Sequence, residues 1–132
     1  MMIETMNRIE VISLFVEDLT AARHFYVDTL CLPVVFEDSA SAVVKFENLM
    51  INLLQAAHAP ELVELLRVAP PEAGSRFMLT ILVEDVDAIF RQLSGRGVAF
   101  LNGPVDRAWG RRTAAFADPS GNVWEIAHKL AQ

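Results

Sequence analysis

A six-residue pattern occurs twice in this chain of 132 residues, with an offset of 67 positions. Val16-Glu17-Asp18-Leu19-Thr20-Ala21 reappears as Val83-Glu84-Asp85-Val86-Asp87-Ala88. An apolar stretch precedes each copy, and a helical periodicity follows it. A repeat at a fixed spacing indicates two copies of one supersecondary unit. The sequence therefore predicts two similar modules in one chain.

Each copy of the repeat is predicted to join a strand to a helix. The Glu-Asp pair stands where the helix would begin, and side-chain capping and the helix dipole both favour acidic residues there. Proline or glycine then ends each helix, at Pro33 in the first copy and at Gly95 and Gly97 in the second. The apolar residues at helical spacing are Ala22, Phe25, Tyr26 and Leu30, and then Val86, Ile89, Phe90 and Leu93.

Three short β-prone segments follow each predicted helix, bounded by turn residues. A linker over Ala59–Pro71, with a short helix at Pro60–Arg67, separates the modules. The fold class is therefore α+β with two tandem βαβββ modules, over residues 7–58 and 75–130. The predicted strands are Pro33–Glu37, Ala42–Glu47, Leu49–Ala56, Val98–Leu101, Arg111–Ala117 and Asn122–His128, with a turn at Asp118–Asn122.

Composition excludes several classes of protein. Hydrophobic residues make up 53% of the chain and charged residues 21%, which excludes intrinsic disorder. No apolar run is long enough to span a bilayer. A net charge of −6 argues against nucleic acid as a partner. So many apolar residues in a small chain need a partner subunit or an internal cavity to cover them.

Cysteine usage and the N-terminus indicate a cytoplasmic protein. Cys31 is the one cysteine, so no intrachain disulfide can form, and a reducing compartment is the simplest setting. Its neighbours supply no base or cation, and we expect a buried, unreactive thiol. Met1-Met2-Ile3-Glu4 does not resemble the start of a secretory signal.

The segment from Trp109 to Glu125 resembles a known family. Its Trp-Gly, Arg, Phe, Asp-Pro-Ser-Gly-Asn and final Glu are similar to a pattern of the vicinal oxygen chelate superfamily, which includes glyoxalases, extradiol dioxygenases and bleomycin-resistance proteins. The resemblance implies that the strands curl around a cavity, with metal ligands on the first and last strands of each module. The matching positions in this chain are Val11, Asn52, Met78 and Glu125.

Those four residues make a poor metal site. Val11 has no donor atom, Met78 offers a soft thioether and Asn52 a neutral carbonyl, so Glu125 is the one strong ligand. The histidines do not replace the missing donors, because solvated or structural roles are expected for His24, His58 and His128. We therefore expect no metal and no other cofactor.

What remains at the cavity positions is an apolar surface with a few polar groups. Strand alternation places Ser13 and Phe15 on the face of Val11, and Thr80 on the face of Met78. Glu125 needs a partner there, and Arg112 on the neighbouring strand or a ligand could supply it. Trp109 could stack on the ligand. The predicted ligand-binding residues are Val11, Ser13, Phe15, Asn52, Met78, Thr80, Trp109, Arg112 and Glu125.

The favoured function is metal-free binding of a small aromatic or cationic compound, as the resemblance to the bleomycin-resistance branch implies. The alternatives are enzymes. One is a metal-dependent glyoxalase-type lyase or extradiol-type dioxygenase, and the other is a metal-free enzyme with Glu125 as its catalytic acid or base. The expected partners are a small-molecule ligand and a second subunit, with neither nucleic acid nor a membrane involved.

Overall fold

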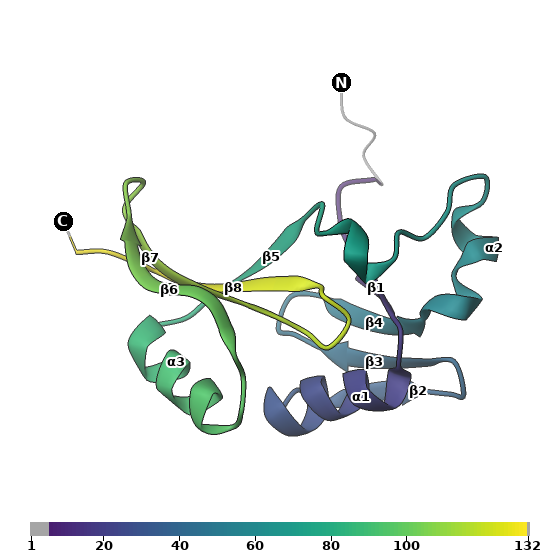
Figure 1. The fold of residues 1–132 in the computed structure, drawn as a ribbon, viewed down its shortest axis with the longest axis horizontal. Coiled ribbons are helices and arrows are strands. Elements are labelled where there is room, and N and C mark those ends of the chain that lie inside the picture. The colour runs from purple at the N-terminus through teal and green to yellow at the C-terminus, as the bar shows by residue number, and fades with distance from the viewer. Residues whose placement is uncertain (1–5, 132) are drawn as a thin grey trace. The chain divides into compact units, whose positions relative to one another are not determined.

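Each half of the chain folds as a strand, a helix and three further strands (Figure 1). The structure is a computed structural model that describes residues 6–131. The chain divides into two compact units, Met1–Val68 and Ala69–Gln132. The repeat therefore marks the two modules that it predicts, and the α+β fold class is confirmed.

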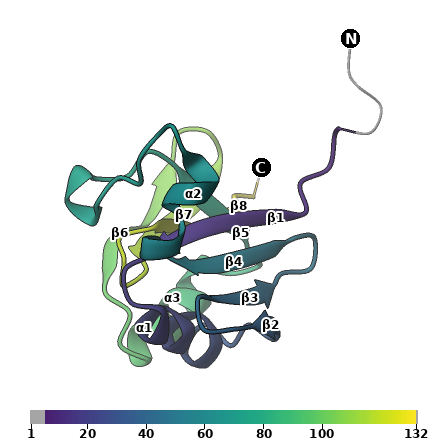
Figure 2. The same cartoon turned by 90° about the vertical axis from the view of Figure 1, so that its right-hand side faces the viewer.

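The first unit is one four-stranded sheet with a helix against it. The strand order is β1-β4-β3-β2, as Figure 2 shows, and β1 pairs with β4 in parallel while the other neighbours are antiparallel. The elements are β1 (Val11–Val16), α1 (Leu19–Arg23) with a π-helical continuation (His24–Thr29), β2 (Val34–Glu37), β3 (Ser41–Lys45) and β4 (Met50–Gln55).

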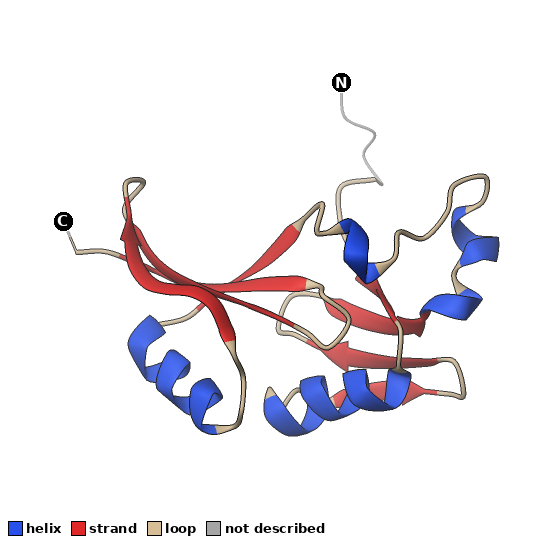
Figure 3. Cartoon of the chain, viewed as in Figure 1, coloured by secondary structure: helices blue, strands red, loops and turns tan. Residues whose placement is uncertain are grey.

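The second unit repeats this topology. Its strand order is β5-β8-β7-β6, again with a parallel pair between the first and last strands. The helix α3 covers one face of the sheet and contacts β6, β7 and β8 (Figure 3). The elements are β5 (Met78–Leu82), α3 (Val86–Gly95), β6 (Phe100–Arg107), β7 (Arg111–Ala117) and β8 (Val123–Lys129).

Both helices begin at the predicted acidic residue. The Asp18 carboxylate accepts a hydrogen bond from the backbone N–H of Ala21 at 3.1 Å, and Asp85 does the same for Ala88 at 3.2 Å. Each bond satisfies an N–H that the first turn of a helix leaves without a partner. Aspartate in the second position of the Glu-Asp pair thus fixes where each helix starts.

The core of each unit is formed by alternate strand residues and the helix that packs on them. Leu14 and Val16 of β1 are buried, as are Phe116 of β7 and Trp124 and Ile126 of β8. In the second unit the ring of Phe100 lies between Phe90 of α3 and Phe116 of β7, with centroids at 4.5 and 5.5 Å. The core of each unit thus lies between its helix and one face of its sheet.

The strand β6 extends beyond the predicted Val98–Leu101, to Arg107. The pair Gly103-Pro104 resembles a turn in sequence, but here the register of β6 on β7 shifts between Asn102 and Val105 and pairing resumes. Gly103 has φ +86°, and a Cβ on it would overlap the carbonyl oxygen of Thr113. Only glycine lets the two strands approach this closely. The strand thus continues through residues that are usual strand breakers.

Two other expectations are wrong. The linker helix α2 covers Pro60–Val63 rather than Pro60–Arg67, because Glu64 is extended and the apolar Leu65 and Leu66 that follow are exposed. Cys31 is exposed rather than buried. Its backbone has φ +62°, and it lies in the loop after the π-helical segment, outside the helix that packs on the sheet. Within residues 6–131, every helix is too short or too polar to cross a bilayer.

Candidate functional site

A threonine and a glutamate face each other across two neighbouring strands of the second unit. The register of β5 on β8 places Thr80 directly opposite Glu125, and the Thr80 hydroxyl donates to a Glu125 carboxylate oxygen at 2.9 Å. This bond leaves the second carboxylate oxygen of Glu125 for another donor. Thr80, rather than Arg112, is therefore the partner that the strand geometry gives to Glu125.

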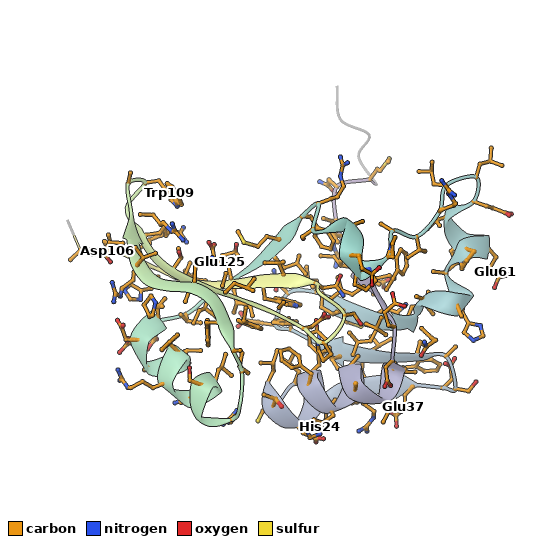
Figure 4. All side chains as sticks on the ribbon, in the orientation of Figure 1. His24, Glu37, Glu61, Asp106, Trp109 and Glu125 are labelled. Carbon is orange, nitrogen blue, oxygen red and sulfur yellow. The ribbon has the colours of Figure 1, made fainter. Side chains whose placement is uncertain are left out.

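Glu125 lies on the face of the sheet that α3 does not cover. Its neighbours along β8, Trp124 and Ile126, are buried on the helix side, and successive strand residues point to opposite faces. Figure 4 shows the labelled Glu125 on the side of β8 away from α3. We call this the open face of the second sheet.

The open face has a floor of small side chains beside Glu125. The cross-strand row that begins with Thr80 and Glu125 continues with Ala115 on β7 and Asn102 on β6. Ala127, next along β8 on the same face, is also small and buried. Two strand spacings separate Glu125 from Asn102, roughly 10 Å. Ala115 and Ala127 are buried, so two small apolar side chains lie beside Glu125, and Ala115 separates it from the polar Asn102.

Exposed apolar side chains border this floor. Met78 and Leu82, on β5 and on either side of Thr80, are 46% and 66% exposed. Trp109, at the tip of the β6–β7 hairpin, is 70% exposed and is labelled in Figure 4. Polar anchors among exposed apolar groups are the usual composition of a small-molecule site.

Arg107 belongs to the same face, and the sequence analysis missed it. Its Nε donates to the buried hydroxyl of Thr113 at 3.0 Å, and its Nη2 donates to Asn102 Oδ1 at 3.1 Å. Thr113 is two residues from Ala115 on β7, so it faces the same side as Glu125. The guanidinium carbon lies 5.9 Å from the centre of the Trp109 ring. Arg107 lies beyond Leu101, where the predicted strand Val98–Leu101 ends, and β6 shifts its register on β7 twice before reaching it.

Arg112 lies on the opposite face, so the predicted pairing with Glu125 is wrong. The register places Arg112 opposite His128, one residue out of step with the Ala115–Glu125 pair. Its guanidinium instead donates twice to Asp87 of α3, at 2.9 and 3.0 Å, and to Asp106 at 2.9 Å. The hydrogen bond from Arg112 holds the pKa of the Asp87 carboxyl below its usual range, and the bonds to Asp87 and Asp106 raise the pKa of Arg112. Arg112 thus ties α3 and β6 to β7.

The first unit has an equivalent of the Thr80–Glu125 pair in which an uncharged amide replaces the carboxylate. Asn52 of β4 lies opposite Ser13 of β1, and Asn52 Nδ2 donates to the Ser13 hydroxyl at 3.2 Å. Among the residues that the structure describes, Asn52 Oδ1 is the buried side-chain oxygen that lacks a hydrogen-bond donor. Val11 and Phe15, the predicted neighbours of Ser13 on this face, are half-buried. A ligand with an N–H or O–H group would satisfy Asn52.

The residues at the family's metal-ligand positions do not fit a catalytic divalent ion. Glu125 is the one carboxylate among them and already accepts a bond from Thr80, and Asn52 is a neutral amide. Val11 has no donor atom, and the Met78 thioether is too soft for zinc, iron or manganese. Within residues 6–131, no three His, Cys, Asp or Glu side chains gather in a way that could hold an ion.

Each histidine has the structural or solvated position expected from the sequence. His24 lies on the helix surface, with its Nδ1 2.9 Å from Asp28. His58 is exposed at the end of a short 3₁₀ turn, Ala56–His58. His128 Nδ1 accepts a hydrogen bond from the backbone N–H of Val86 at 2.8 Å, at the start of α3. None of these three side chains is placed beside Glu125 by the strand register.

Comparison with known proteins identifies a family whose model matches most of the chain. The family model of the Glyoxalase/Bleomycin resistance protein/Dioxygenase superfamily matches residues 8–126. The chain is 37% identical over 123 residues to YraH of Bacillus subtilis (strain 168), an uncharacterized protein. This match covers 90% of the chain and 96% of YraH.

Three solved structures are similar over more than nine-tenths of the chain. A glyoxalase/bleomycin resistance protein/dioxygenase from Nocardioides is 25% identical, with a TM-score of 0.82, over 94% of this chain and 84% of that one. The antibiotic binding protein TnmS3 from Streptomyces sp. CB03234 is 26% identical, with a TM-score of 0.72, over 94% and 97%. Lactoylglutathione lyase from Agrobacterium tumefaciens is 19% identical, with a TM-score of 0.74, over 91% and 92%, and shows likeness of fold alone.

Proposed function

The chain belongs to the Glyoxalase/Bleomycin resistance protein/Dioxygenase superfamily, and from this premise we propose that it binds a small aromatic compound without a metal ion. One observation carries the proposal. The Thr80–Glu125 pair lies on an open sheet face among exposed Met78, Leu82 and Trp109, which offer a polar anchor, apolar contact and an aromatic surface. A cationic or N–H group of the ligand would meet the free oxygen of Glu125.

Binding rather than metal-dependent catalysis is supported by the donor set. Glyoxalase and dioxygenase chemistry uses a metal ion to stabilise an enediolate or to bind oxygen. Of the four positions, Glu125 supplies one strong ligand and Asn52 one weak one, whereas a catalytic ion needs about three protein donors. The likeness to the antibiotic binding protein TnmS3 agrees with a binding role, since that protein shares the fold at 26% identity.

Metal analysis of the purified protein tests the metal-free proposal. The protein is prepared without chelators, and its nickel, zinc, iron and manganese are measured beside those of the Glu125→Ala variant. We expect no metal at stoichiometric amounts in either. A stoichiometric metal that is present in the wild type and lost in Glu125→Ala would overturn the proposal and favour an enzyme.

A thermal-shift screen tests binding itself. Any ligand that binds the native state alone raises the melting temperature. We expect aromatic amines or glycopeptides in a broad panel to stabilise the wild type, and to stabilise Glu125→Gln less. Gln keeps the length and an acceptor oxygen but removes the charge, so it separates charge recognition from shape. A panel without any stabilising compound would contradict the proposal.

We also propose that the protein is a homodimer. Large apolar side chains are exposed in both units, among them Val35 and Phe36 on β2 and Leu101 on β6, and burial against a second copy would remove them from water. Light scattering coupled to gel filtration at several concentrations measures the mass directly. A monomer mass across the whole range would show this proposal to be wrong.

A further inference from the structure

The most unusual charge on the open face of the second sheet is that of Arg107. Both of its hydrogen-bond partners, Thr113 and Asn102, are neutral. Arg112, on the adjacent strand, has two carboxylates instead. Among residues 6–131, no carboxylate lies within ion-pair distance of Arg107. A cation held in place without a counter-charge can attract an anion from solution.

The two hydrogen bonds also fix how the guanidinium is presented. Nε and Nη2 are engaged, and a guanidinium has more N–H groups than these two bonds use. The Nη1 group and part of Nη2 are therefore left for a ligand. A planar pair of N–H groups matches the two oxygens of a carboxylate, which favours a two-point contact. Thr113 and Asn102 act as positioning residues for this contact.

An aromatic ring stands next to this cation. Trp109 lies within cation–π distance of Arg107, and it is 70% exposed. One side of its indole is therefore open to stack on a planar ligand. The floor of Ala115 and Ala127 separates Arg107 from Glu125, so the two charges stand at opposite ends of the open face.

We propose that Arg107, oriented by Thr113 and Asn102, binds the carboxylate of an aromatic acid whose ring stacks on Trp109. This inference rests on the proposed function and narrows its ligand class. A molecule that also carries an ammonium group at the far end of its ring would meet Glu125. The site then selects an aromatic compound with opposite charges at its two ends, rather than a simple aromatic cation.

Four compounds on one ring separate the two ends of the site. The probes are 4-(aminomethyl)benzoate, 4-(aminomethyl)benzamide, benzoate and benzylamine, and their dissociation constants are measured by titration calorimetry or ligand-observed NMR. We expect 4-(aminomethyl)benzoate to bind best. Its amide should bind about tenfold more weakly or worse, because the amide loses the charged hydrogen bonds to Arg107.

Variants assign the loss to Arg107. Arg107→Gln should weaken the binding of 4-(aminomethyl)benzoate and benzoate by about tenfold or more. The affinity for benzylamine should stay unchanged. Asn102→Ala removes one of the two hydrogen bonds that position the guanidinium. It should weaken the binding of the two carboxylate probes by a smaller factor. The matched control is Arg91→Gln on the exposed surface of α3, which removes the same charge and should change no affinity. Circular dichroism and melting curves show whether each variant is folded.

Each outcome decides the question. Equal binding of the acid and its amide, or full affinity in Arg107→Gln, would overturn the carboxylate assignment. Binding of benzylamine alone, lost in Glu125→Gln, would also overturn it while leaving the proposed binding function in place. Failure of all four probes at millimolar concentration would contradict this inference, and the broad thermal-shift panel then decides separately whether the protein binds aromatic compounds at all.

Discussion

Asn52 and Glu125 occupy the same position in the two modules, and only Glu125 carries a charge. Each lies on the strand that comes last along the chain of its module, β4 or β8. Each faces a hydroxyl residue on the neighbouring strand that comes first, Ser13 on β1 or Thr80 on β5. The hydrogen bond across the parallel strands is kept in both, at 3.2 and 2.9 Å. The two parallel strand pairs thus share the same geometry and differ in the charge of the residue on the later strand.

Replacing Asn52 by leucine should stabilise the protein. The buried Oδ1 of Asn52 lacks a donor, and such a group costs free energy that an apolar side chain of similar size avoids. The exposed Ser13 hydroxyl can bond to water instead. We expect Asn52→Leu to raise the free energy of unfolding by about 1 kcal/mol, measured by urea denaturation.

The matched control for that experiment is Asn48→Leu. Asn48 is exposed in the turn before β4, so the same change of side chain there should alter stability by less than about 0.5 kcal/mol. A lower unfolding free energy for Asn52→Leu would mean that the asparagine contributes to the native state more than its missing hydrogen bond costs.

Gly103→Ala should be strongly destabilising. The new Cβ would lie 2.6 Å from the Ala114 Cα and would overlap the Thr113 carbonyl oxygen, at a backbone φ of +86°. Backbone strain and overpacking together suggest a loss of about 2–4 kcal/mol in chemical denaturation. Gly97→Ala is the control, because Gly97 has φ +94° with open space around it, and should cost about 1 kcal/mol. Equal losses at the two sites would show that the strand approach at Gly103 contributes nothing.

The contribution of Arg112 to stability should disappear in acid. Its hydrogen bonds lower the pKa of Asp87, so the pair stabilises the fold above the unfolded-state pKa of about 4 and loses that effect as the pH falls through the lower folded-state pKa. Arg112→Gln should therefore be less stable than the wild type at pH 7, with the difference shrinking below about pH 4. Urea denaturation across this range measures it. Arg76→Gln, at an exposed loop position, should give a small difference that does not change with pH.

Trp109 should report ligand binding by fluorescence. It is 70% exposed, whereas Trp124 is buried at 3% and should not respond. We expect the emission to shift or quench on addition of 4-(aminomethyl)benzoate, and the change to vanish in Trp109→Phe. Trp109→Ala should weaken binding, with less than about 0.5 kcal/mol of change in stability because the side chain is largely in water. An unchanged spectrum at saturation would remove Trp109 from the site.

The repeat and the acidic caps were sufficient to predict the architecture. Asp18 and Asp85 mark both helix starts, and the predicted strand Arg111–Ala117 has the observed bounds. Local signals of this kind are strong because capping and alternation are short-range properties. The predicted linker helix Pro60–Arg67 is too long, because a local signal does not show what a helix packs against. Its propensity is local, but Leu65 and Leu66 have no surface to pack on, and helices this short depend on packing.

The candidate site could be predicted only in part. Alternation along β8 correctly places Glu125 and His128 on opposite faces. The face of Arg112 depends on the register of β7 on β8, which the sequence alone does not give. Arg107 lies outside the predicted strand Val98–Leu101, because β6 continues through a bulge at Gly103-Pro104 that the sequence did not indicate. A β-bulge depends on how closely a second strand approaches, and a single sequence carries little information about that distance.

The parallel strand pair in each module is held by main-chain hydrogen bonds, and its register is equivalent whether the facing side chain is an amide or a carboxylate. A substitution at Asn52 or Glu125 therefore changes the polarity of the sheet face and leaves the strand pairing as it is. Two copies of the module thus give one chain two sheet faces whose charge can change independently of each other and of the backbone.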